Sequence, residues 1–193
     1  MARDNHESDP SNDESDRAHG PAGDLRIAEA VTRLEVAVER RIGFGRATNT
    51  ASITLVDGLR CCSEEGAWSI DTDLPTGLGG SGSAPTPGVL LRAALGSCLA
   101  MGYRLRAARR CIPVRSIRVT VESDSDIDGM LHTTSTAPPG FTAIRYHVEL
   151  DTSAPAEDIE AMVDEADQLS PILDAVGRAN RVRRSLSIVD GAA

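Results

Sequence analysis

PGVLLRAALGSCLAMGYRLRAARRC, residues 87–111, is the stretch that decides the fold of this chain. Thr86 can cap a helix here, and Pro87 suits the first helical position, where no N–H is needed. As far as Leu99 the predicted helix is apolar on nearly every side, which is typical of a buried helix. Its last turns carry cations that suit a helix C-terminus, namely Arg104, Arg106, Arg109 and Arg110. We therefore predict one long central helix around which the other elements pack.

The rest of the sequence predicts both helices and strands around this helix. Residues 24–42 have neighbouring apolar faces at helical spacing, with Asp24 as the cap, and so predict an N-terminal helix. Alternating apolar residues, separated by turn signals such as Asp57-Gly58, predict three strands between residues 46 and 72. After the central helix we expect two strands, two helices and a last strand, at 115–122, 141–151, 155–169, 171–176 and 183–189. The predicted fold class is α+β.

Composition divides the chain into an acidic tail and one globular domain. Residues 1–23 are mostly polar, acidic, Gly and Pro, with too few apolar side chains to offset the entropy of ordering. We expect them to be a disordered tail, and residues 24–193 to form one domain with its core at 46–189. The formal net charge is −9, and neither part has the basic surface that nucleic acids require.

Several kinds of site are disfavoured by the residues present. All 20 basic residues are arginine, so the chain has no lysine for Schiff-base chemistry or for a lysine-bound cofactor. The four histidines lack metal-ligand spacing and no Cys-x-x-Cys occurs, so we expect no metal and no cofactor. The N-terminus is unlike a signal peptide, and the uncharged stretch 93–103 is too short to span a bilayer. We expect a cytoplasmic protein with no membrane partner, large enough to need no disulfides.

Residues 77–82, GLGGSG, match the spacing of a dinucleotide-binding loop, but their surroundings do not. In that motif a helix opens at the glycines, so that its N-terminus faces the pyrophosphate. Here Pro85 and Pro87 intervene and the helix begins later. No acidic residue follows at about twenty positions further on. We interpret the glycines as a loop that passes close to another element.

Cys98, about halfway along the central helix, is the candidate reactive residue. Small residues around it would let another backbone approach closely. Judged by spacing alone it is more simply a small buried hydrophobe, as free cysteines commonly are. Cys61 and Cys62 are adjacent on a predicted strand, so they point to opposite faces. Cys111 lies thirteen residues after Cys98, about 20 Å along one helix, which is too far for a disulfide within the chain.

The stretch from Leu78 to Ala100 has a glycine pair, a Thr-Pro helix start and an Ala- and Leu-rich run into Cys98, and it resembles the OsmC/Ohr family. The resemblance continues through residues 139–145, PGFTAIR, and 169–174, LSPILD. It covers about Arg46 to Val189. The N-terminal helix and residues 128–131, DGML, are more similar to an OsmC-like branch than to Ohr proteins themselves.

This resemblance implies an intertwined homodimer with antiparallel sheets wrapped around central helices and two active sites at the subunit interface. It also implies that Cys98 matches the peroxidatic cysteine of members that reduce organic hydroperoxides. The second, resolving cysteine of those members falls at Ser170, and their activating glutamate falls at Gly88. Their activating arginine lies in the first hairpin, where Arg60 is the candidate and Arg46 a weaker substitute. Such a cation lowers the pKa of a thiol and so favours the thiolate.

Two functions follow from this interpretation. The first is thiol-dependent reduction of organic hydroperoxides in oxidative-stress defence, with Cys98 and Arg60 as catalytic residues. An external thiol, or Cys61 or Cys62, would then resolve the sulfenic acid. The second is a non-catalytic dimer of the same fold that binds a small apolar ligand or senses redox state through Cys98. We favour the enzyme, because peroxidase members of the family carry a cysteine at this place.

Overall fold

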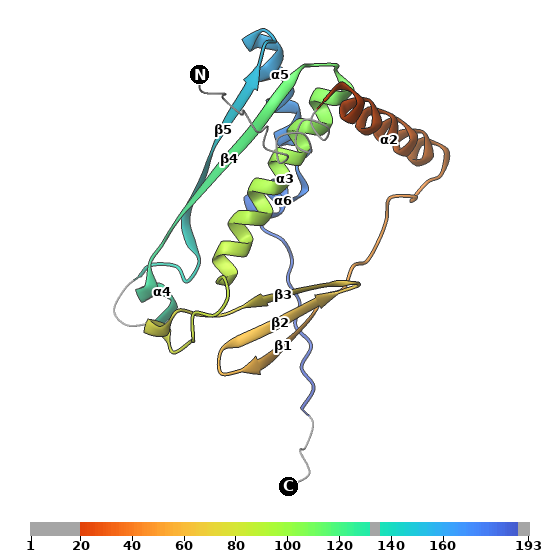
Figure 1. Ribbon diagram of the computed structural model, residues 1–193. Coiled ribbons are helices and arrows are strands. Elements are labelled where there is room, and N and C mark those ends of the chain that lie inside the picture. Colours follow the sequence, from red (N-terminus) through yellow and green to blue (C-terminus); the bar gives the residue numbers. More distant parts are fainter. Residues whose placement is uncertain (1–19, 132–135, 189–193) are drawn as a thin grey trace, which may run out of the picture.

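The computed structural model describes residues 20–131 and 136–188, and it confirms an α+β fold with antiparallel sheets. A long central helix runs beside a two-stranded sheet, and a second, three-stranded sheet lies near the start of that helix (Figure 1). In chain order the elements are α2 (Pro21–Arg40), β1 (Ser52–Asp57), β2 (Arg60–Glu65), β3 (Trp68–Thr72), the 3-10 turn η1 (Thr76–Leu78), α3 (Pro87–Arg109), β4 (Val114–Ser125), α4 (Ile127–Leu131), β5 (Phe141–Thr152), α5 (Ala156–Gln168) and α6 (Pro171–Gly177).

The central helix α3 begins where the sequence predicts. The Thr86 side chain accepts a hydrogen bond from the backbone N–H of Val89, at 3.4 Å, which is the expected N-cap. At the other end Cys111 adopts a left-handed conformation, with φ of 55°, and the backbone N–H of Ile112 bonds to the carbonyl of Ala107. This tight reversal stops the helix and turns the chain into β4.

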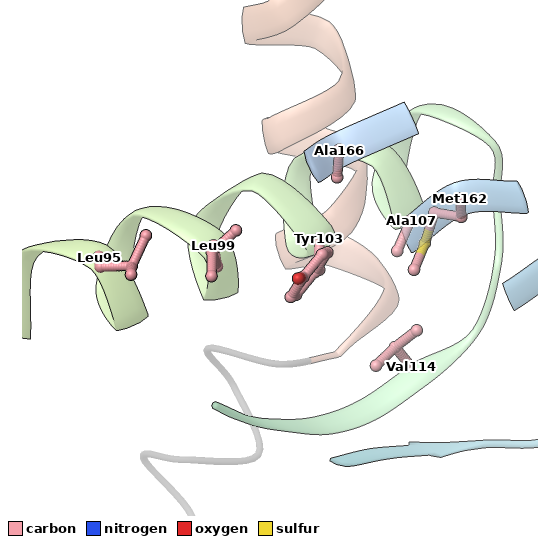
Figure 2. Close-up of a cluster of buried hydrophobic side chains, with 7 residues drawn as sticks. All are labelled: Leu95, Leu99, Tyr103, Ala107, Val114, Met162 and Ala166. Atoms are coloured by element: carbon pink, nitrogen blue, oxygen red, sulfur yellow. The ribbon is translucent and has the colours of Figure 1, made fainter. Parts of the chain in front are cut away.

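The core forms along one stripe of α3. Leu95, Leu99, Tyr103 and Ala107 recur every four residues, and all are at most 1% exposed. Figure 2 shows this stripe with Val114 from β4 and with Met162 and Ala166 from α5. Before Leu99 the Val89 side chain is 41% exposed, and after it Met101 is 64% exposed, so the predicted burial of this helix is incomplete in a single chain. The other elements of a single chain cover only part of the surface of α3.

The strands β4 and β5 form a long antiparallel hairpin whose inner face packs on α3. Their register pairs Val119 with Val148 and Val121 with Tyr146. Alternate residues point to the same face of a strand, so these apolar side chains all reach the core. Gly96 lies where α3 meets this sheet, because a Cβ there would come within 3.2 Å of the Val121 side chain.

The strands β1, β2 and β3 form a separate meander, as predicted, in the order β1-β2-β3. Its register pairs Leu55 with Cys61 and Ser63 with Ile70, so one face of the sheet collects apolar side chains. These side chains remain exposed, with Trp68 at 79%. The sheet lies apart from β4 and β5 (Figure 1).

Three sequence predictions about the chain ends need correction. The first described helix begins at Pro21, so residues 21–23 belong to it and not to the tail; residues 1–19 lie outside the described range. Gly20 is its N-cap, and Asp24 instead forms an ion pair with Arg104. The predicted strand at 183–189 is wrong for residues 183–188, which are extended and exposed without a strand partner in the described chain; residue 189 lies outside it. A strand forms only when another strand accepts its hydrogen bonds.

The glycine-rich loop is organised by a buried carboxylate. Asp73, 2% exposed, accepts hydrogen bonds from the backbone N–H groups of Leu74, Ser81 and Ser83 and from both serine hydroxyls. These donors, the Ser81 hydroxyl first, hold the pKa of Asp73 well below its usual range. A Cβ on Gly80 would overlap the carbonyl of Leu74. The glycine here therefore allows close backbone packing within its own loop, and not against another element as predicted.

Candidate functional site

Cys98 lies half-buried on α3, and its sulfur meets the residue that occupies the predicted second-cysteine position. The Sγ atom of Cys98 is 3.4 Å from the Oγ atom of Ser170, seventy-two positions later in the chain. Ser170 is 4% exposed and caps α6, where its Oγ accepts from the backbone N–H of Leu173 at 3.3 Å. Either the thiol or the hydroxyl can be the donor in this contact, because each carries one hydrogen and can also accept.

A cavity of about 330 Å³ opens beside these two side chains. The apolar walls come from Val31 and Leu34 on α2 and from Met101 and Leu105 on α3. The end of α5 and the start of α6 close it with Ala166, Leu169, Ser170 and Pro171. Two further hollows, of about 440 and 420 Å³, lie along α2, but neither includes Cys98. The cavity beside Cys98 is therefore the one that joins the helix cysteine to Ser170.

Arg106 is the charged residue among those that line this cavity. It lies eight residues after Cys98 on α3, or about 12 Å along the helix axis. Its Nε is 3.5 Å from Glu165 on α5, and Arg110 pairs with the same carboxylate. Two guanidinium groups thus share one carboxylate.

Behind the site, one carboxylate joins three elements of the core. Asp167 at the end of α5 accepts hydrogen bonds from Tyr103 on α3, at 2.7 Å, and from Tyr146 on β5, at 2.6 Å. Its backbone carbonyl accepts from the N–H of Ser170 at 3.2 Å. Burial and the adjacent carboxylate raise the pKa of Tyr146 to about 12 and that of Tyr103 further. Asp167 therefore ties the segment that carries Ser170 to the core.

The structure brings only some of the predicted site residues together. Cys98 and Ser170 meet, as the family spacing implied. Arg60 lies on β2, pairs with Asp71 at 3.3 Å, and does not line the cavity. On the same sheet, Cys62 has its sulfur 3.3 Å from the hydroxyl of Ser69. Cys111 is exposed at the far end of α3 and borders a different hollow.

Two residues at the site were not identified from the sequence. The sequence gives only a weak indication that Arg106 lies on the same side of the helix as Cys98. Residues eight positions apart on a helix lie two turns apart and on neighbouring faces. The sequence gives no indication that Asp167 lies near the site, since an acidic residue on an amphipathic helix normally points to solvent. Among the described residues, no group of three or more His, Cys, Asp or Glu could hold a metal ion. Nor, within those residues, does any helix have the length and apolar character to cross a membrane.

The sequence profile of the OsmC-like protein family matches residues 80–184, which include α3, Cys98 and Ser170. The chain belongs to the OsmC-like family. No curated protein matches its sequence.

Solved structures of this family share the fold. An OsmC-like protein from Mycoplasma pneumoniae is 16% identical, with a TM-score of 0.56 over 68% of this chain and 88% of that one. A protein from Legionella pneumophila, described as an organic hydroperoxide resistance protein OsmC, is 23% identical, with a TM-score of 0.51 over 68% and 91%. An organic hydroperoxide resistance protein from Elizabethkingia anophelis is 18% identical, with a TM-score of 0.50 over 68% and 90%.

Proposed function

We propose that this OsmC-like protein reduces organic hydroperoxides through Cys98, as part of oxidative-stress defence in the cytoplasm. The observation that carries the proposal is the contact between the Cys98 sulfur and the Ser170 hydroxyl at the end of an apolar cavity. The thiolate of Cys98 is the nucleophile that this reaction requires. Two structures of similar fold are described as organic hydroperoxide resistance proteins, which agrees with this proposal.

The reaction needs one thiolate and an external reductant. The Cys98 thiolate attacks the outer oxygen of the hydroperoxide, the O–O bond breaks, and the alkoxide leaves as an alcohol after gaining a proton. Cys98 is then a sulfenic acid. A low-molecular-weight thiol attacks this sulfur and releases water, and a second thiol completes a disulfide and restores Cys98. Within one chain the resolving thiol has to be external, because Ser170 stands where a resolving cysteine would be and no other described cysteine lines the cavity.

We propose that the functional unit is a homodimer. Support comes from apolar side chains that one chain leaves uncovered on two elements. Ile53, Leu55, Trp68 and Ile70 are at least 50% exposed on the meander. Val182, Leu186 and Ile188 are at least 72% exposed in the extended C-terminal segment. Exposed apolar side chains that gather on one face, as those of the meander do, are typical of an interface.

The dimer also gives Arg60 a possible role. The meander stands away from the rest of the chain (Figure 1), so a partner subunit could receive it. Arg60 lies on the face of the meander opposite to Leu55 and Ile70, so we propose that this polar face approaches Cys98 of the other subunit. Its present partner, Asp71, is about as exposed as Arg60 itself, and such pairs are weak. Arg60 therefore stays the proposed activating cation, acting across the interface.

Mass spectrometry of the intact protein tests the proposal. Reduced protein is treated with sub-stoichiometric cumene hydroperoxide, with and without dimedone, which traps sulfenic acid. We expect one dimedone adduct, located on Cys98 by peptide analysis, and cumyl alcohol in equal amount. No adduct on Cys98, or equal labelling of Cys111, would contradict the enzymatic function. A non-catalytic dimer that binds a small apolar molecule in the same cavity would then be the better account.

A further inference from the structure

Met101 on the central helix is a reactive side chain that the proposed function does not use. It lines the cavity beside Cys98 and also the hollow of about 440 Å³ between α2, α3 and β4. It follows Cys98 by three positions on α3, and residues at this spacing are neighbours on a helix, with Cβ atoms about 5–6 Å apart. The Met101 thioether therefore belongs to the same wall as the Cys98 sulfur.

The other methionines that the structure describes have different surroundings. Met162 is fully buried in the core, where an oxidant in solution cannot reach it. Met130 on α4 is 49% exposed but is not among the residues that line the cavity of Cys98. Met101 is 64% exposed and does line that cavity. It thus combines access with a place beside the proposed reactive centre.

A thioether in this place can react with the same oxidant as Cys98. Its sulfur attacks the outer oxygen of a hydroperoxide, the S–O bond forms and the O–O bond breaks. The leaving alkoxide takes the proton of the transferred oxygen and departs as an alcohol. Sulfur is oxidised to the sulfoxide and the peroxide is reduced, so no other reactant is needed.

The order of the two reactions follows from their nucleophiles. The Cys98 thiolate is a stronger nucleophile than a thioether, so reduced Cys98 reacts first. While Cys98 waits as a sulfenic acid for an external thiol, a second hydroperoxide in the cavity meets Met101. Oxidation of Met101 therefore requires that hydroperoxide exceeds the thiol supply.

The sulfoxide changes the character of the cavity wall. The neighbouring wall residues are apolar, namely Val31, Leu34, Leu105 and Leu169. A sulfoxide places a polar, chiral group among them in place of a flexible apolar one. Desolvating that group costs free energy when an apolar molecule enters, so binding of an apolar hydroperoxide weakens.

We propose that Met101 is a reversible modification site, oxidised by hydroperoxides that occupy the cavity of Cys98, and that its sulfoxide lowers turnover. The inference rests on the proposed function, because a hydroperoxide has to enter this cavity. It adds a form of regulation to that function: the site becomes less active when hydroperoxide exceeds thiol. Methionine sulfoxide reductases would restore the thioether and with it the activity.

Peptide mass spectrometry of full-length Cys98→Ser tests the oxidation step without turnover. The variant is exposed to cumene hydroperoxide or to hydrogen peroxide, and sulfoxide formation is followed at each methionine. With cumene hydroperoxide, which the apolar wall can hold, Met101 should oxidise about tenfold faster than Met130. With hydrogen peroxide, which gains nothing from that wall, the two rates should be nearly equal. Met162 should stay unoxidised and so reports that the variant is folded.

Residual turnover tests the consequence. Wild type and variants are exposed to excess cumene hydroperoxide, thiol is then restored, and turnover is compared with that of an unexposed sample of the same variant. Wild type and Met130→Leu, the matched control, should lose activity that methionine sulfoxide reductases restore. Met101→Leu, similar in volume but without a thioether, should lose less and should not respond to the reductases. Met101→Gln, whose amide resembles the sulfoxide in polarity, should start with kcat/KM about fivefold lower.

The outcomes separate this inference from the proposed function. Equal oxidation of Met101 and Met130 by cumene hydroperoxide, or an equal loss of activity in wild type and Met101→Leu, would overturn the inference while turnover by Cys98 stands. Selective oxidation of Met101 in a protein whose wild type shows no turnover would remove the peroxidase and keep the modification site.

Discussion

The helical layer around α3 and the meander β1–β3 differ in how one chain covers their apolar side chains. In the first, Leu95, Leu99 and Tyr103 are at most 1% exposed. In the second, Trp68 is 79% and Ile53 62% exposed. The comparison teaches that the helical layer covers its apolar side chains within one chain, whereas the meander leaves its own exposed, which is where we propose that a partner subunit packs. Cys98 belongs to the complete half, and Arg60 to the other.

The largest expected effect is on hydroperoxide turnover, and it should differ between cysteines of the two regions. Cys98→Ser should abolish hydroperoxide reduction, because the hydroxyl of serine cannot replace a thiolate, while the melting temperature stays close to that of wild type. Cys61→Ser and Cys62→Ser, on the meander, should keep turnover within about twofold. Steady-state consumption of cumene hydroperoxide measures this. If Cys98→Ser matched wild type, the reactive centre would lie elsewhere.

A second substitution tests the contact within the helical region. In Ser170→Cys, the new thiol should attack the Cys98 sulfenic acid, release water and form a disulfide, because the two side chains already meet at 3.4 Å. Non-reducing peptide mapping after peroxide treatment detects the bond. Leu169→Cys, one residue earlier and 58% exposed, is the matched control and should not form it. Absence of the bond in Ser170→Cys would contradict this placement of Ser170.

Truncation of a core side chain tests whether the helical layer is stable without a partner subunit. Leu99→Ala should lower the free energy of unfolding by about 2–5 kcal/mol, because it leaves a cavity in a fully buried stripe. Chemical denaturation measures this, and the loss should not depend on protein concentration. A loss below about 1 kcal/mol would mean that α3 is packed differently.

Trp68→Ala makes the matching test on the meander. An exposed tryptophan contributes little to the stability of one chain but is a frequent hot spot in association. We expect dimer dissociation to become easier by about 2 kcal/mol, seen as a shift of the monomer–dimer midpoint in analytical ultracentrifugation. Arg118→Ala, on the outer face of β4, is a suitable control because its side chain is 78% exposed. A wild type that is monomeric at micromolar concentration would refute the dimer itself.

The parts of the fold that the sequence predicts are those set by local signals, and the parts that it does not predict depend on distant partners. Thr86-Pro87 and the apolar run after it located α3, and alternation located both sheets, because these signals are local. The alternating pattern at 183–188 misled, since a strand also needs a partner strand, and residues 20–131 and 136–188 supply none there. Ser170 was found only through family spacing. Arg106 was missed because its role depends on which carboxylate on α5 it shares, which no local pattern records.

The smallest expected effect lies behind the site, at Tyr146. Its hydroxyl donates to Asp167, and burial with this bond raises its pKa from 10.0 to about 12. A raised folded pKa means that the protonated tyrosine stabilises the fold below about pH 10, and that this contribution disappears as the pH rises towards 12. Tyr146→Phe should therefore lower the free energy of unfolding by about 1 kcal/mol at pH 8. The difference from wild type should narrow between pH 10 and 12.

This chain is well suited to the measurement, because it has no lysine and only two tyrosines. Few other groups titrate in that range, so the alkaline limb of the stability curve reports mainly on Tyr103 and Tyr146. Urea denaturation of wild type and Tyr146→Phe at several pH values gives the two curves. A difference that stayed constant or widened above pH 10 would show that the tyrosine is not held by Asp167. Asp167 would then no longer account for how α6, and with it Ser170, is fixed against Cys98.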